Sequence, residues 1–348
     1  MKKFDVIVVW GWPAGVAASV VLKKNNINYC VIDRCKFPRE KLCGGAISNK
    51  SIFTLNKLGL NIENLKVTKV KEVRFVANNV DVNMKLDRPV IMVYRFEFDN
   101  NNIKQIANDN LYEWESVVNI NDNVLITDKN EYGYEYIIFA DWVNGCSKNL
   151  IENRKFGFCV KYDIDEELAN PIFDFTVIDS GYGWIFPKND HITIGLGTIW
   201  TGTFDIKNIN GYLDSLCKFG EKYNFKIDKN KIKAYPIPIF SKEIYRSSVI
   251  DNKYILVGDA ACLVDRASWE GIYYALSSWA AAAESIIYSM KDKSDLKRTY
   301  FKRTRKIYSS LKKRAFLSKL LYSKYGSTFI KIGLSNRFFI NKLNSVFW

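Results

Sequence analysis

The stretch 4-FDVIVVWGWPAGVAASVVLKKNNINYCVIDR-34 decides the fold of this 348-residue chain. Its residues 4–9 form a short apolar, β-branched run, which predicts a buried parallel strand. A segment rich in Ala, Val and Leu follows from Pro13 and predicts a helix, and a second apolar strand at 29–32 ends at Asp33. This spacing is typical of a βαβ unit that binds a dinucleotide, with the pyrophosphate at the helix N-terminus and the acidic residue on the ribose.

The turn of this unit does not carry the glycines that such a unit needs. The usual pattern G-x-G-x-x-G would place glycine at positions 10, 12 and 15, but Trp10 and Trp12 stand at the first two. The first glycine allows a tight turn and the second lets the backbone approach the phosphates. We therefore expect Trp12 to fill the space of the pyrophosphate. The residues of this unit that are candidates for cofactor binding are Gly11, Pro13, Ala14, Gly15, Asp33 and Arg34.

Three further stretches make the pattern specific: 37-FPREKLCGG-45, 181-GYGWIFPKNDHITIGLG-197 and 256-LVGDAACLVDRASWEGIYYAL-276. Together with the first stretch they resemble the geranylgeranyl reductase family of FAD-dependent oxidoreductases, whose fold is that of p-hydroxybenzoate hydroxylase-like flavoproteins. The resemblance runs over roughly residues 4–290 in the family's order. The middle stretch fits the family pattern Tyr-x-Trp-x-Phe-Pro, seven residues, Gly-x-Gly.

The resemblance implies an α/β protein with a discontinuous, glutathione-reductase-like FAD-binding Rossmann domain and a substrate domain built on a mostly antiparallel sheet. We expect the FAD-binding domain at 1–70, 95–150 and 250–295, the substrate domain at 71–94 and 151–249, and a basic helical region at 296–348. Local patterns agree: residues 66–100 alternate as antiparallel strands do, and 270–291 is a long Ala-rich helix.

The family also implies a function. Reduced FAD would deliver hydride from its N5 to a carbon–carbon double bond of a polyprenyl, geranylgeranyl-type lipid. The electron donor would be NAD(P)H or a reduced carrier protein. One alternative is a flavin-dependent monooxygenase of a small apolar substrate, and another is a cofactor-free relative that binds a membrane or a partner.

Site residues follow from the same stretches. Cys43 is the candidate catalytic residue, although a free cysteine is more often an inert small hydrophobe. Asp259 follows an apolar strand and could bind the cofactor or simply cap the next helix. The further residues implied in cofactor binding are Arg39, Gly44, Gly45, Asp141, Gly258, Ala260, Gly271 and Ile272. The residues implied in substrate binding, or in ordinary core packing, are Tyr182, Trp184, Phe186, Pro187, Gly195 and Gly197.

Six tryptophans fall where the family has glycine. They are Trp10, Trp12, Trp114, Trp142, Trp269 and Trp279, whereas Trp184 is a tryptophan in the family too. The 19 glycines make up about 5.5% of the 348 residues, and six more would raise this to the roughly 7% of an average protein. We hypothesise that the gene reads UGA as glycine and was translated with UGA as tryptophan. The alternative is that the tryptophans are real and the cofactor has been lost.

Composition limits the other kinds of protein that this chain could be. The apolar content of 48% excludes general disorder. None of the seven cysteines has CxxC spacing, and His191 is the single histidine of the sequence. We therefore expect no metal site and no disulfide framework. The first strand begins at once, which leaves no room for a signal peptide, and no apolar run is long enough to span a membrane. The cytoplasm is the expected compartment.

The net charge of +14 is concentrated at the C-terminus. Residues 296–348 contain 14 Lys/Arg and no acidic residue, so the rest of the chain is balanced. Apolar residues at helical spacing predict a basic amphipathic helix, which could pack on the body of the protein or lie on an anionic membrane surface, at the inner face of the membrane. No nucleic-acid-binding module accompanies it, so we expect no nucleic-acid partner.

Overall fold

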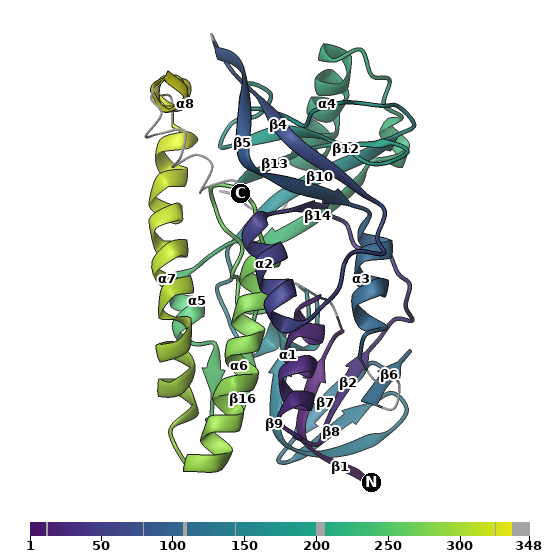
Figure 1. Cartoon of the computed structure of the whole chain (residues 1–348), viewed down its shortest axis with the longest axis vertical. Helices are drawn as coiled ribbons and strands as arrows, with labels where there is room; N and C mark the ends of the chain where they lie inside the picture. Colours follow the sequence, from purple (N-terminus) through teal and green to yellow (C-terminus); the bar gives the residue numbers. More distant parts are fainter. Residues whose placement is uncertain are drawn as a thin grey trace.

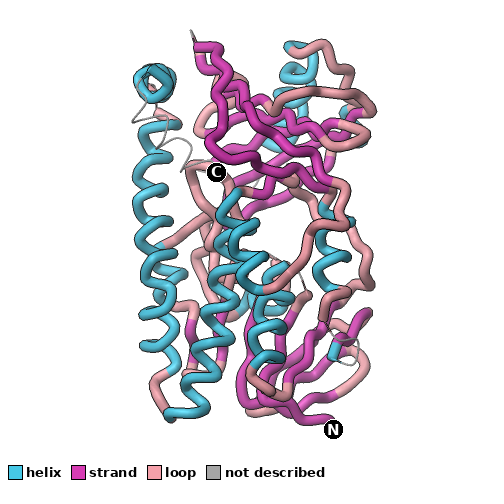
Figure 2. The backbone as a smooth tube through the Cα atoms, viewed as in Figure 1, coloured by secondary structure: helices cyan, strands magenta, loops and turns pink. Residues whose placement is uncertain are grey.

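The computed structural model describes residues 1–11, 13–78, 80–106, 110–142, 144–199, 206–323 and 325–335. Figure 2 shows the strands gathered in two groups at opposite ends of the molecule, with helices between them and along one side. Each group is an eight-stranded sheet. This two-sheet α/β architecture with a helical C-terminus confirms the predicted fold class.

The first sheet contains the βαβ unit of the N-terminal stretch. Its strands are β1 (Lys2–Val9), β2 (Tyr29–Asp33), β6 (Leu111–Glu113), β7 (Val117–Asn121), β8 (Val124–Thr127), β9 (Glu131–Phe139), β15 (Val249–Ile250) and β16 (Tyr254–Leu256). The order is β15-β16-β9-β1-β2-β6, and β8 pairs with both β7 and β9. Val9 pairs with Ile32 on one side and Phe139 on the other, in parallel register. The carboxyl ends of these strands therefore lie at one edge, where open α/β sheets bind ligands.

Burial explains why the N-terminal stretch forms the centre of this sheet. Residues 6–9 are completely buried, and each buried valine or isoleucine side chain contributes about 1.5–3 kcal/mol to the free energy of unfolding. Helix α1 (Pro13–Lys24) follows the turn and packs against the long helix α6 (Ile272–Asp292). The first and the last of the sequence stretches that carry the family resemblance therefore lie side by side on one face of the sheet (Figure 1).

The second sheet is mostly antiparallel. Its strands are β3 (Ala46–Ile47), β4 (Val67–Ala77), β5 (Val80–Val93), β10 (Phe156–Ile164), β11 (Ile172–Asp174), β12 (Gly181–Pro187), β13 (Ile192–Ile199) and β14 (Lys233–Pro238). The order is β14-β10-β13-β12-β11-β4-β5-β3, and only the β11–β4 pair is parallel. The predicted alternation of residues 66–100 is confirmed as far as Val93 by the antiparallel pair β4 and β5, whereas the helix α3 (Arg95–Ile103) replaces it from residue 95. The exact domain boundaries stay a prediction.

The other helices cover the sheets or connect them. They are α2 (Asn49–Leu58), α3 (Arg95–Ile103), α4 (Ile206–Lys222), α5 (Lys242–Arg246), α7 (Leu296–Leu321) and α8 (Gly326–Ser335). Helix α2 begins at the N-cap Ser48 and ends at Gly59, whose φ of 80° is left-handed. Such an ending favours glycine, because a side chain there would be strained.

The basic helix α7 packs lengthwise against α6 along one side of the molecule (Figure 1). Its residues Leu296, Tyr300, Ile307 and Leu311, which the helical spacing placed on one face, are buried, whereas Phe316 is 67% exposed. Packing on the body therefore accounts for most of the apolar face. Among the described residues, no helix combines the length and the low charge that crossing a bilayer requires.

Candidate functional site

A cavity of about 180 Å³ lies between the two sheets. Three segments form its walls: the loop 41–46, strand β12, and the segment 268–275 that leads into α6. Residues Ala140 and Trp142, directly after β9, close it at the carboxyl edge of the first sheet. The stretches that carry the family resemblance, far apart in sequence, therefore converge on one site.

The loop 43–45 is held tightly against β12. The φ of Gly45 is 77°, which favours glycine, and a Cβ on Gly44 would lie 2.9 Å from Cδ2 of Phe186. Lys188, just after β12, donates a hydrogen bond from Nζ to the carbonyl oxygen of Gly44 at 2.5 Å. The two glycines are thus required by close packing, and their backbone forms part of the cavity wall.

Cys43 lies among cations in this loop. The backbone N–H of Gly45 donates to its Sγ at 3.3 Å. Burial acts to raise the pKa of the Cys43 thiol, but the Arg95 guanidinium, the Gly45 N–H and Lys188 outweigh it, so the pKa lies below its ordinary value. Burial lowers the pKa of Lys188 to about 7, although Cys43 opposes this. The site therefore contains a thiol and an amine that both titrate closer to neutrality than usual.

Two further charged groups line the cavity. Lys41 forms an ion pair of 3.4 Å with Asp259, and burial lowers the pKa of Lys41 although Asp259 opposes this shift. Arg95 is held by Asp99, one helical turn away, through two hydrogen bonds of 2.9 Å each. A bidentate pair of this kind fixes the guanidinium plane toward the cavity.

The aromatic wall explains the spacing of the Tyr-x-Trp-x-Phe pattern and its later Gly-x-Gly. Tyr182, Trp184 and Phe186 share one face of β12 because alternate residues of a strand point to the same side. On the neighbouring β13, Gly195 pairs with Trp184 and Gly197 pairs with Tyr182. A Cβ on Gly195 would collide with the Trp184 ring, and a Cβ on Gly197 would lie 2.8 Å from Sγ of Cys159, so both positions favour a residue without a side chain. All three aromatic residues line the cavity.

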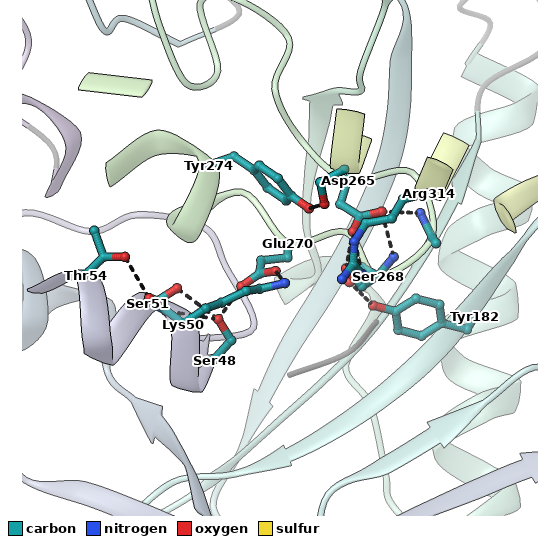
Figure 3. Close-up of polar contacts among 12 residues, drawn as sticks. Ser48, Lys50, Ser51, Thr54, Tyr182, Asp265, Ser268, Glu270, Tyr274 and Arg314 are labelled. Atoms are coloured by element: carbon teal, nitrogen blue, oxygen red, sulfur yellow. Dashed lines mark hydrogen bonds and ion pairs between the residues drawn. The ribbon is translucent and has the colours of Figure 1, made fainter. Parts of the chain in front are cut away.

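The segment 265–271 crosses the cavity opposite the aromatic wall, and polar contacts hold it at both ends (Figure 3). The hydroxyl of Tyr182 donates to the carbonyl oxygen of Ser268 at 2.8 Å. Arg314 of α7 forms an ion pair of 3.0 Å with the buried Asp265. At the other end, Ser48 and Lys50 of the α2 region both contact the Glu270 carboxylate. Trp269 lies between these anchors.

The turn after β1 forms a second cluster around Asp33. The completely buried Asp33 carboxylate accepts hydrogen bonds from the backbone N–H of Gly11 and Cys35 at 2.9 Å, and from Arg39 at 2.8 Å. The guanidinium of Arg34 lies 4.4 Å from the Trp10 ring centre. A Cβ on Gly15 would collide with the carbonyl oxygen of Trp10, so α1 approaches this turn as closely as a dinucleotide fold requires.

The structure brings many of the predicted site residues to the cavity and places others elsewhere. Those at the cavity are Cys43, Gly44, Gly45, Tyr182, Trp184, Phe186, Asp259, Gly271 and Ile272. Gly11, Gly15, Asp33, Arg34 and Arg39 form the turn cluster instead. Pro13 and Ala14 begin α1, and Trp12 lies outside the described residues.

Six predicted residues have other contacts. Asp141 is completely buried and accepts from the backbone N–H of Ser147 at 2.6 Å, so its carboxylate holds the following turn rather than lining the cavity. The Ala260 side chain is completely buried in the core. Pro187 lies in β12 and Gly195 and Gly197 lie in β13, where Gly195 leaves room for the Trp184 ring and Gly197 for Cys159. Gly258 has a φ of 52° and packs under Ala275 of α6.

Sequence reasoning missed Arg95 and Lys188. The spacing of Arg95 and Asp99 is a helical i, i+4 pair and could have indicated an ordered guanidinium. Lys188 follows the aromatic pattern directly, but nothing in its local sequence shows that it reaches Gly44, which is 144 residues away. Within the described residues, no group of acidic, histidine and cysteine side chains is arranged to hold a metal ion.

Comparison with known proteins finds relatives that match most of the chain. An uncharacterised protein of Methanosarcina barkeri is 32% identical over 355 residues, covering 94% of this chain and 86% of the relative. A chloroplastic geranylgeranyl diphosphate reductase of Arabidopsis thaliana is 29% identical, covering 88% and 72%. A menaquinone reductase of Mycobacterium tuberculosis is 26% identical, covering 85% and 78%. No protein-family model matches the chain.

The fold has solved counterparts. A geranylgeranyl bacteriochlorophyll reductase-like protein of Thermoplasma acidophilum superposes with a TM-score of 0.78 at 16% identity, covering 98% of this chain and 96% of that protein. At this identity the likeness concerns the fold alone.

FAD, the cofactor that this resemblance implies, can be tested against the residues present. The backbone around the site fits it: Gly44, Gly45 and Gly271 leave main chain open to the cavity, and α1 begins at the Asp33 turn. The tryptophans do not fit. Trp10 occupies the first-glycine position, and Trp142, Trp269 and Trp279 line a cavity smaller than the roughly 300–1,000 Å³ of ligand pockets.

Proposed function

This chain belongs to the geranylgeranyl reductase family of FAD-dependent oxidoreductases, and from this premise we propose that it reduces carbon–carbon double bonds of a polyprenyl lipid. Bound FAD would supply the hydride for such a reaction. The proposal applies to the chain with glycine at the six positions named above, because the tryptophans as written do not fit the cofactor.

The aromatic wall of the cavity carries this proposal. Tyr182, Trp184 and Phe186 form one apolar face, and Phe173 extends it, with its ring 5.3 Å from that of Phe186. A polyprenyl chain has no polar group along its length, so it is recognised by apolar and aromatic surface. The loop 43–45 packs against this wall, and its Gly44 and Gly45 leave backbone rather than side chain at the cavity.

The experiment is product analysis by mass spectrometry. The six-glycine chain, reconstituted with FAD and chemically reduced, is incubated separately with geranylgeranyl diphosphate and with a menaquinone. Products with added hydrogen support the proposal. The substrate that is reduced faster shows whether the enzyme prefers a diphosphate or a quinone head group. Trp184→Ala should lose most activity, because it removes the centre of the aromatic face. Phe53→Ala is the matched control, because Phe53 is 70% exposed on α2 and outside the site. Products with added oxygen would instead indicate a monooxygenase.

We also propose that α7 brings the enzyme to an anionic membrane surface, where polyprenyl lipids reside. The support is an exposed helix face on which Phe316, 67% exposed, lies beside the exposed Lys312, Lys313 and Lys319. Apolar side chains flanked by lysines suit the interface of an anionic bilayer.

Vesicle sedimentation tests the membrane contact. We expect the protein to sediment with vesicles containing anionic lipid and to be released by high salt. Phe316→Asp should weaken binding, whereas Tyr288→Asp, an exposed aromatic on α6, should not. Equal binding by both variants, or no binding at all, would exclude this role for α7.

A further inference from the structure

Three tryptophans have a backbone conformation that suits glycine. The φ angles are 81° at Trp10, 57° at Trp114 and 60° at Trp269. Residues with a side chain rarely adopt such angles, and Asn and Asp account for most exceptions, whereas glycine adopts them freely. None of the tyrosines and phenylalanines that the structure describes has a positive φ. All three tryptophans belong to the six that replace a family glycine.

The conformation at Trp269 is imposed by its neighbours. Its backbone N–H donates to the carbonyl oxygen of Asp265 at 2.9 Å, and the N–H of Asp265 donates to the carbonyl oxygen of Glu270 at 2.9 Å. The side chains on both sides are anchored as Figure 3 shows: Glu270 by Ser48, and Asp265 by Arg314. The turn cannot relax around Trp269 without breaking these contacts.

Trp114 is held in the same way, although it lies outside the cavity. Its neighbour Glu113 pairs with Asp33 in the first sheet and accepts from the backbone N–H of Phe37 at 2.6 Å. On the other side, the N–H of Glu115 donates to the carbonyl oxygen of Asp33 at 3.0 Å. The Trp114 side chain is itself 61% exposed. Its backbone is therefore set by the flanking residues, and its indole adds little packing.

Trp10 is fixed between two contacts of the central sheet. Its N–H donates to the carbonyl oxygen of Ile32 at 2.8 Å, and the next N–H, that of Gly11, donates to the Asp33 carboxylate. Its own carbonyl oxygen lies against Gly15. Each of these contacts requires the tight turn that a first glycine provides in a dinucleotide fold.

We propose that glycine is the native residue at positions 10, 12, 114, 142, 269 and 279, and that only the glycine form binds FAD. The claim about FAD binding rests on the proposed flavoprotein function. The claim that the backbone requires glycine does not depend on that function. Trp142 and Trp279 lack a positive φ and instead occupy the cavity wall. Trp279 is completely buried, and its indole N–H has no hydrogen-bond partner among the described residues. Trp12 lies outside the described residues and is included through the resemblance alone.

The gene sequence gives the first test. We expect UGA codons at all six positions and UGG at Trp184, the tryptophan that the family shares. Six UGG codons would overturn the decoding explanation.

The second test is independent of any cofactor. Trp114→Gly in the full chain should raise the thermal unfolding midpoint of the FAD-free protein by a few degrees, because it relieves a left-handed side-chain residue. Tyr94→Gly is the matched control: Tyr94 is also an exposed aromatic, but its φ is −83°, so glycine there should lower the midpoint. If Trp114→Gly lowers the midpoint as the control does, the glycine requirement fails.

The third test measures flavin retention. The chain as written and the six-glycine chain are incubated with FAD, dialysed, and compared by visible flavin absorbance. We expect only the six-glycine chain to retain FAD. Retention by the chain as written would overturn the proposal that the tryptophans exclude the cofactor. If neither form retains FAD while Trp114→Gly is stabilising, the backbone requirement for glycine holds and the proposed flavin-dependent function is excluded.

Discussion

Trp184 and Trp269 line the same cavity from opposite walls, and they are held for opposite reasons. Trp184 lies in the extended strand β12, where its ring fills the space over Gly195. Trp269 lies in the anchored segment 265–271 with a φ of 60°. At position 184 the packing specifies a large side chain. At position 269 the neighbouring residues impose a backbone conformation that favours glycine, which has no side chain. The identity of a residue can thus follow from the space around its side chain or from the φ angle of its main chain.

The largest expected effect is at the aromatic wall. Trp184→Ala should lower the free energy of unfolding by about 3–5 kcal/mol, because it removes a large buried ring and leaves a cavity. Urea unfolding followed by circular dichroism measures this. A loss below about 1 kcal/mol would show that Trp184 is not a core residue, and the comparison with Trp269 would lose its basis.

The anchors of the opposite wall come next. Asp265→Asn keeps the shape of the side chain but leaves Arg314, whose side chain is only 12% exposed, without its 3.0 Å partner charge. Removing one member of a buried ion pair costs about 3 kcal/mol or more. The same unfolding experiment tests it, with Asp190→Asn as the control, because Asp190 is 84% exposed. Similar small losses in both variants would mean that the segment 265–271 is not held by this pair.

A pair of substitutions at each wall sharpens the comparison. At position 269 we expect Trp269→Gly to be more stable than Trp269→Ala by about 1 kcal/mol, because alanine retains the left-handed strain. At position 184 we expect the reverse order, by about 0.5–1 kcal/mol, because glycine weakens a strand. Denaturant midpoints of the four variants measure both differences. The same order at both positions would contradict the backbone argument.

A pH-dependent effect is expected at Lys188, which follows β12 and contacts Gly44 of the loop 43–45. Burial lowers its pKa from the ordinary 10.5 to about 7, so the unfolded chain binds the proton more strongly than the folded one between these values. Its contribution to stability should therefore rise with pH across this window and be lost as the pH falls toward 7. Relative to that of Lys188→Met, the free energy of unfolding of the parent chain should rise by about 1 kcal/mol per pH unit between pH 7 and 9. A difference that does not change with pH would contradict the lowered pKa.

Much of the fold could be predicted because its signals are local. The apolar run at 4–9 and the alternation in β4 and β5 each report on neighbours within one element. The shared face of Tyr182, Trp184 and Phe186 follows from strand periodicity alone. The positions of Asp33 and Cys43 near a cofactor-type site were predicted from motifs, and the structure places them at the turn and at the cavity.

Other parts of the site depend on contacts between distant segments. Arg95 and Lys188 meet Cys43 only because β12, α3 and the loop 41–46 converge. The motifs also do not show that the Asp141 carboxylate accepts from Ser147 or that the Ala260 side chain is packed in the core. A motif identifies a residue type at a position, but it does not show which of several nearby groups its side chain contacts.

The sequence by itself determined the fold class, the family and the set of tryptophans that depart from the family pattern, because these follow from residue order and periodicity. Only the tertiary structure decided which tryptophans conflict with the backbone. The φ angles at Trp10, Trp114 and Trp269 are set by hydrogen bonds and ion pairs to residues from other elements. Such constraints arise when the sheets and loops come together, and no local stretch of sequence contains them.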